Sequence, residues 1–210
     1  MNGFTQQGQN KTRVGRSERG FTLTELVVVI LIIGVLIALS IPPMQGSGLT
    51  KGEMTQTLSN MKQLHLATQC LAQDGITTGD TSLGGWPGDK GDSYYYWAQQ
   101  LVPSYLTTND FCKLLSAPGK VVPSGKIPYS LYDSAVLVYA VSSNSPGNAV
   151  FLTSANFTNG PKGGAPLQEK AKPYGNKGFV VFRKGGDGVI LQARQVTNTS
   201  HIGSYAPLCR

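Results

Sequence analysis

The hydropathy pattern is dominated by one apolar run near the start of the chain. No charged residue occurs from Leu26 to Thr50, and the positions from Leu26 to Ile41 are almost all Val, Ile and Leu. Counted from Phe21 to Ile41, the segment has 21 residues. At about 1.5 Å per residue it forms a helix of about 30 Å, which matches the hydrocarbon core of a bilayer. The pattern therefore predicts a membrane-spanning helix.

The next stretch, 42–52, contains poor helix formers. It holds Pro42 and Pro43 and three glycines, all of which disfavour a helix interior. We expect a break in the helix here. A plain linker and a kink that lets the helix bend explain the composition equally well.

Helical periodicity returns over 53–74. Apolar residues recur there at steps of three and four and form one face: Met54, Leu58, Met61, Leu64, Ala67 and Leu71. We expect this face to pack on a sheet, His65 to face solvent, and Asp74-Gly75 to end the helix.

A long connection follows over 75–133, rich in Gly, Asp, Tyr and Pro. Its aromatic cluster at 94–97 begins a short predicted helix, 94–101, and a second one is expected at 109–115. The cluster is either a binding face or a small separate core beneath the loop, and the second interpretation is favoured because long loops often pack on their own side chains.

The last third of the chain has strand character. Segments 134–142 and 149–155 flank a turn signal at 144–147, and segments 177–183 and 189–196 flank the glycine-rich turn 185–188. These patterns predict two hairpins in one antiparallel sheet of about four strands. The expected fold class is α+β: a long N-terminal helix whose apolar half is embedded in a membrane and whose second half packs on the sheet.

The net charge of +7 is partly explained by where the basic residues lie. Residues 1–20 carry four basic side chains against Glu18, as expected for a segment kept on the cytoplasmic side of a membrane. The later lysines are scattered and form no basic stripe, which argues against nucleic acid as a partner: Lys120, Lys126, Lys162, Lys170, Lys172, Lys177 and Lys184.

Candidate chemistry elsewhere is sparse. Cys112 with Cys209 is a candidate disulfide that would tie the C-terminus to the domain, and Cys70 with Cys112 stays open because sequence does not fix connectivity. No zinc-ligand spacing, cofactor motif or catalytic set occurs, so we expect no enzyme. No cofactor is expected either, although a structural calcium ion at Asp89 and Asp92 remains open.

The start of the apolar run carries a specific motif. Gly20-Phe21-Thr22-Leu23-Thr24-Glu25-Leu26 before a long apolar helix resembles the prepilin leader and first helix of the type IV pilin family, which includes the pseudopilins of type II secretion. Pro42 also falls where many pilins have a proline. The resemblance implies cleavage after Gly20 by a prepilin peptidase and methylation of the new Phe21 amine.

Together these patterns divide the chain into three parts. Residues 1–20 are the expected leader peptide, 21–52 the transmembrane and assembly helix with its Pro/Gly break, and 53–210 a periplasmic or extracellular pilin-like globular domain. The leader is expected in the cytoplasm, with a single pass through a bacterial inner membrane.

Glu25 is the residue that a passive membrane anchor does not explain, because an ionisable group inside a span is costly. In a filament, the Phe21 amine of a neighbouring copy can pair with Glu25, and an unpaired carboxylate then penalises wrong registers. Thr22 can add a hydroxyl contact at the same end.

The resemblance predicts a structural filament subunit of a type IV pilus or a type II secretion pseudopilus. Its implied partners are other copies of the chain and related pilins, the prepilin peptidase, an assembly ATPase with its membrane platform, and inner-membrane lipid. The alternative is a minor pilin at the filament tip that binds DNA or another surface ligand. The motif is common to major pilins, pseudopilins and minor pilins, so it does not separate them.

Overall fold

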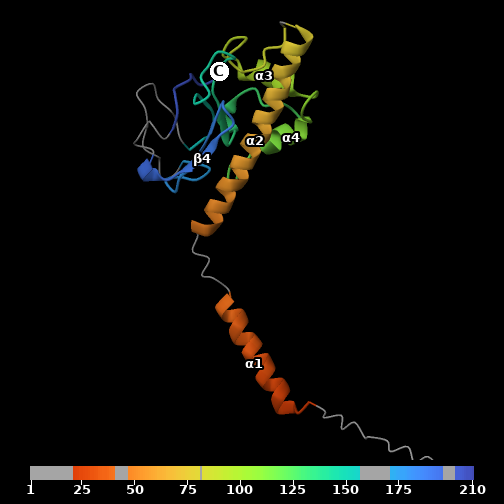
Figure 1. Cartoon of the computed structure of the whole chain (residues 1–210), viewed down its shortest axis with the longest axis vertical. Helices are drawn as coiled ribbons and strands as arrows, with labels where there is room; N and C mark the ends of the chain where they lie inside the picture. The colour runs from red at the N-terminus through yellow and green to blue at the C-terminus, as the bar shows by residue number, and fades with distance from the viewer. Residues whose placement is uncertain (1–20, 41–46, 81, 157–170, 196–201) are drawn as a thin grey trace, which may run out of the picture. The chain divides into compact units, whose positions relative to one another are not determined.

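The computed structural model describes residues 21–40, 47–80, 82–156, 171–195 and 202–210 in two compact units, Met1–Met44 and Gln45–Arg210 (Figure 1). Each unit is described by itself. The predicted leader with Gly20, and the predicted helix break at Pro42 and Pro43, lie outside the described residues.

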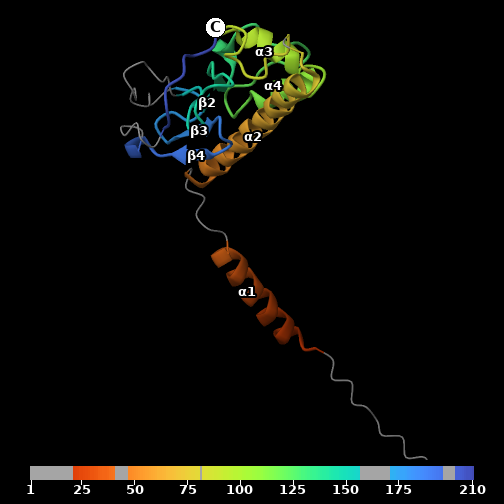
Figure 2. The ribbon, with the colours of Figure 1, turned by 45° about the horizontal axis from the view of Figure 1, so that its top comes forward.

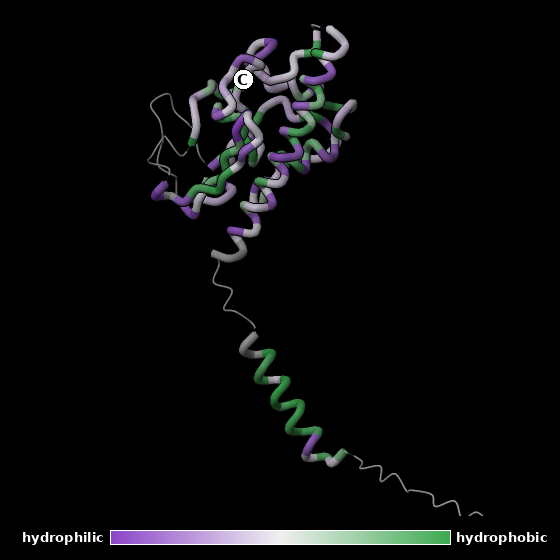
Figure 3. The backbone as a smooth tube through the Cα atoms, viewed as in Figure 1, coloured by the Kyte–Doolittle hydropathy of each residue, from purple (hydrophilic) through white to green (hydrophobic). Residues whose placement is uncertain are grey.

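The first unit contains helix α1, Leu23–Ser40. Its apolar character is continuous along the helix (Figure 3), because Val, Ile and Leu fill nearly every position after Glu25. Among the described residues, no helix combines the length and apolar character required to cross a membrane. The predicted span 21–41 extends two residues before α1 and one residue after it, and it stays a prediction.

The second unit begins with the long helix α2, Ser47–Thr78. The prediction of a helix over 53–74 was right in type but too short at both ends. Gly52, expected to lie in the helix break, lies inside this helix. The helix continues past the predicted stop at Asp74-Gly75, and Gly79 with φ +67° follows its last residue.

Four strands form one antiparallel sheet in the order β1-β2-β3-β4, as predicted. Their bounds are Val136–Val138, Val150–Ser154, Phe179–Arg183 and Gly188–Leu191. Helix α2 packs along β3 and β4 (Figure 2), so its apolar face covers the sheet as expected. The observed fold is therefore α+β, consistent with pilins.

The first predicted strand, 134–142, is shorter in the structure because its second half pairs with the C-terminus. Tyr139 forms a bridge with Leu208, and the Cys209 amide donates to the Val138 carbonyl at 3.0 Å. The Arg210 amide adds a bond to the Asp92 carbonyl. Backbone hydrogen bonds thus hold the C-terminal residues in place.

The disulfide expected between Cys112 and Cys209 is not formed, and all three cysteines are free thiols. The Cys112 thiol is buried and faces the Lys126 carbonyl, with 3.4 Å between sulfur and oxygen. Burial raises the pKa of the Cys209 thiol to about 12. The tail needs no covalent tie because backbone hydrogen bonds already fix it.

Two of the four aromatic residues at 94–97, Tyr94 and Trp97, are buried in the core, whereas Tyr96 is 39% exposed. The cluster lies on α3, Tyr94–Leu101, and packs with α4, Thr108–Leu114, both near their predicted bounds. The Trp97 ring lies 5.9 Å from Phe151 of β2 and 6.1 Å from Phe111 of α4, between ring centroids. The cluster is therefore continuous with the main core and is not a separate one.

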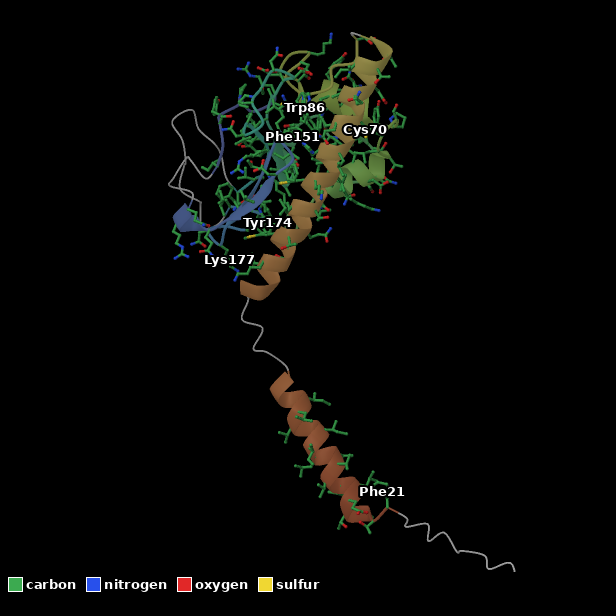
Figure 4. All side chains as sticks on the ribbon, in the orientation of Figure 1. Phe21, Cys70, Trp86, Phe151, Tyr174 and Lys177 are labelled. Carbon is green, nitrogen blue, oxygen red and sulfur yellow. The ribbon has the colours of Figure 1, made fainter. Side chains whose placement is uncertain are left out.

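His65 was predicted to face solvent, and this was wrong: it is only 2% exposed. Its ring lies 5.1 Å from Phe182 and 5.7 Å from Trp86, between centroids. Its Nε2 donates to the Lys184 carbonyl at 2.7 Å, since a carbonyl can only accept. Figure 4 shows Trp86 and Phe151 on the side of α2 where this aromatic core lies. Periodicity places His65 at the edge of the apolar face of the helix. Trp86, from a loop beyond the end of the helix, covers it there.

This burial predicts a pH dependence of folding stability. Burial lowers the pKa of His65 below its usual 6.5, so the unfolded chain binds a proton at that residue more readily than the folded chain does. We expect the free energy of unfolding to be unaffected by His65 above pH 6.5 and to fall as the pH drops from 6.5 towards the lowered pKa, by at most about 1.4 kcal/mol per pH unit.

The measurement is urea unfolding between pH 5 and 8, with His65→Gln as the control because its amide can still donate to the Lys184 carbonyl. Other groups titrate alike in both proteins, so the difference between their plots of unfolding free energy against pH isolates the contribution of His65. If the two plots have the same slope, the protonation of His65 is the same in the folded and unfolded chains.

Candidate functional site

The candidate site is the start of α1, where Thr22 and Glu25 close the first helical turn. The Thr22 amide donates to Glu25 Oε2 at 2.8 Å, and the Glu25 amide donates to Thr22 Oγ1 at 3.3 Å. Thr22 is the residue before the helix and Glu25 the third residue within it. This reciprocal pair is a capping box, which satisfies two backbone donors that a helix start leaves without partners.

The sequence signal for this box was present and was missed. Thr-x-x-Glu before an apolar run is its signature, and Thr22-Leu23-Thr24-Glu25 fits it. The structure thus gives Glu25 a role within its own chain, besides the register role predicted for it between chains. Thr22, expected to add a hydroxyl contact at this end, donates its hydroxyl to the Glu25 carboxylate.

The Glu25 carboxylate is only partly used by this box. The Thr22 hydroxyl also donates to it, at 3.0 Å, and both bonds go to Oε2. No described residue bonds Oε1. The negative group lies in the first turn of α1, where the helix dipole favours it. One oxygen can therefore hold the cap while the other accepts a donor from another molecule.

The rest of α1 has no polar face. Every side chain from Phe21 to Ile37 is exposed within its unit, and Phe21 itself is 85% exposed. In Figure 4 the side chains of α1 project on all sides of the helix. A helix that is apolar all round is stable only when lipid or other helices cover it. The site therefore combines a capped helix start with a helix whose apolar side chains are exposed within its unit.

Asp89, one of the two residues considered for calcium, has another task. Its Oδ1 accepts the Ser143 amide at 2.7 Å, and its Oδ2 accepts the Ser143 hydroxyl at 2.8 Å and the Trp86 amide at 2.9 Å. The carboxylate fastens the loop to the chain beyond β1. In the described part of the chain, no three or more His, Cys, Asp or Glu residues are grouped so that they could hold a metal ion.

The scattered lysines are not all surface groups. The Lys184 ammonium donates to the carbonyls of Ser143 and Ser145 and lies 5.5 Å from the Trp86 ring centroid. Lys162 and Lys170 lie outside the described residues. The structure thus gives the lysines no common role.

Two comparisons bear on this site. Residues 15–41 match the family model of the prokaryotic N-terminal methylation motif. The chain is also 34% identical over 73 residues to the type IV major fimbrial protein FimA of Dichelobacter nodosus. The aligned segment covers 35% of this chain and 46% of that protein. The chain thus spans about half the length of the curated relative that it matches.

No solved structure matches the chain significantly. The motif and the fimbrial relative nevertheless confirm the resemblance to the type IV pilin family. They place the family's methylation motif on the segment that contains Phe21, the capping box and α1.

Proposed function

We propose that this chain is a structural subunit of a type IV pilus or a related type II secretion pseudopilus. The observation that carries the proposal is the methylation motif, located on a helix whose apolar side chains are exposed all round. A globular protein that works alone has no use for such a helix, whereas a filament subunit buries it against copies of itself.

In the proposed assembly pathway, the subunit is first inserted in the inner membrane. Residues 1–20 stay in the cytoplasm, 21–41 lie in the bilayer, and the globular unit lies on the periplasmic side. A prepilin peptidase cuts after Gly20, and the new amine of Phe21 is methylated. An assembly ATPase and its membrane platform then move the subunit into the filament.

Glu25 is proposed to set the register between subunits. The capping box uses Oε2, so Oε1 can accept the Phe21 amine of a neighbouring copy without loss of the helix start. Inside an apolar bundle, a carboxylate without a cation is strongly disfavoured. Only the axial offset that brings the two groups together avoids that penalty.

The processing step is tested by the intact mass and the first residue of the protein isolated from its native membrane. We expect the mass of residues 21–210 plus one methyl group, and N-methyl-phenylalanine as the first residue. The measurement is mass spectrometry of the intact chain with sequencing of its N-terminal peptide.

The matched control is the same chain made in a host that lacks a prepilin peptidase, which we expect to retain residues 1–20. If the mature protein from its native source also retains them, the Phe21 amine never forms, and the filament proposal is wrong.

A further inference from the structure

A basic groove lies at the N-terminal end of α2 in the globular unit. It has a volume of about 750 Å³, within the range of ordinary ligand pockets. Three cationic residues line it and come from distant parts of the sequence: Lys51 of α2, Lys177 before β3, and Arg194 of the short 3-10 helix Ala193–Gln195. Figure 4 shows Lys177 near this end of α2.

The charge of the groove has one sign. None of the described residues that line it carries a carboxylate. Glu53 is near in sequence, but it does not line the groove, and its position two residues after Lys51 points to another side of the helix. Like charges around a concave surface reinforce one another and attract an anion.

The polar side chains of the groove add hydrogen-bond donors. The Gln195 side-chain oxygen accepts the Gln192 amide at 2.8 Å, so its amino group is the part that remains for a ligand. Asn176 lines the same groove and supplies a further side-chain amide. The cations and these amides suit the oxygens of a phosphate group.

The groove also has an apolar wall. Ile190, at 36% exposed, is the apolar side chain that this wall presents to a ligand, because Met54 and Leu191 are only 2% and 5% exposed. A free inorganic anion would leave this wall uncovered. A molecule with a phosphate at one end and an apolar part beside it would cover both surfaces.

From these features we infer that the groove binds the phosphate headgroup of an anionic phospholipid. In the sequence, Lys51 is eleven residues beyond Ser40, the last residue of α1. A subunit stored in a membrane through α1 therefore keeps the groove within reach of lipid headgroups. In this respect the inference rests on the proposed function. Its role is to hold the unassembled subunit at the membrane surface.

The test uses the full chain in zwitterionic detergent, with native mass spectrometry to count the lipids that remain bound. Phosphatidylglycerol is the probe, phosphatidylcholine the neutral lipid, and glycerol phosphate the soluble headgroup. We expect Lys51→Gln/Lys177→Gln/Arg194→Gln to need about tenfold more phosphatidylglycerol than the wild type for equal retention, since each cation contributes to binding an anionic lipid.

The charge-matched control is Lys62→Gln/Lys90→Gln/Lys126→Gln, because these lysines are exposed and lie outside the groove. It should bind like the wild type. The inference is overturned if the groove variant retains phosphatidylglycerol as well as the wild type does. It is also overturned if the wild type retains phosphatidylcholine as well as phosphatidylglycerol. If glycerol phosphate binds as tightly as phosphatidylglycerol, the ligand is a free phosphate compound and not a lipid.

A further outcome concerns a second copy of the chain as the occupant. If the groove variant keeps its lipid but no longer assembles, the groove contacts another subunit and the lipid assignment is wrong. Lipid retention is measured without cleavage or assembly, so failure of the filament proposal is recognised separately, by residues 1–20 remaining in the mature chain.

Discussion

Glu25→Gln is expected to stop filament assembly while the protein still enters the membrane in normal amounts. Glutamine retains the side-chain oxygen that accepts the Thr22 amide, so the capping box is preserved. It lacks the negative charge that pairs with the Phe21 amine of a neighbouring copy. We expect the yield of filaments to fall at least about tenfold, because a buried cation without its partner strongly disfavours association.

Two further variants separate the cap from the charge. Thr22→Ala removes the hydroxyl that accepts the Glu25 amide and leaves the charge in place, and Thr22→Ser restores the hydroxyl. If the charge sets the register, Thr22→Ala reduces assembly far less than Glu25→Gln does. Thr22→Ser should behave as the wild type.

The measurement compares filaments sheared from cells with the amount of subunit left in the membrane fraction, both by immunoblot. Normal filament yield from Glu25→Gln would remove the charge pair from the mechanism. Loss of filaments from Thr22→Ala to the same extent would assign the role of Glu25 to the helix cap.

Trp97→Ala is expected to lower the free energy of unfolding by about 3–5 kcal/mol. The Trp97 side chain is 1% exposed and lies between Phe111 of α4 and Phe151 of β2. Its removal leaves a cavity where the loop helices join the sheet. Urea or thermal unfolding followed by circular dichroism measures the loss.

Two comparisons show what the Trp97 ring contributes. The Trp97 Nε1 atom has no hydrogen-bond partner among the described residues, so Trp97→Phe should cost clearly less than alanine does. Tyr132→Ala, at an aromatic residue that is 87% exposed, should change stability little. Near-wild-type stability of Trp97→Ala would mean that the aromatic cluster is not core and would return it to the role of a binding face.

The type and order of the elements were predictable from local pattern. Segments of strand character around the turns 144–147 and 185–188 predicted the four strands, and three- and four-residue steps predicted α2. The bounds were less accurate. The stop predicted at Asp74-Gly75 was wrong, since α2 continues to Thr78 and the left-handed residue that follows it is Gly79. The first strand was predicted too long: β1 ends at Val138, and Tyr139 after it bridges to Leu208, which is remote in sequence.

The candidate site is contiguous in sequence, unlike the sheet and the core. Phe21, Thr22 and Glu25 lie within five residues, so their relation follows from helix geometry. Only the capping box was missed, although its spacing was visible. The predicted disulfide, by contrast, depended on a distance between Cys112 and Cys209 that no local pattern contains, and it was wrong.

The sequence by itself determined the apolar helix, its methylation motif, the carboxylate at its start and the α+β class. Each of these depends on residues a few positions apart. Tertiary structure alone decided that His65 is buried, that the aromatic cluster joins the main core, and that Lys51, Lys177 and Arg194 line one groove. The physical reason is that burial and convergence depend on contacts between residues often more than a hundred positions apart, which local periodicity does not encode.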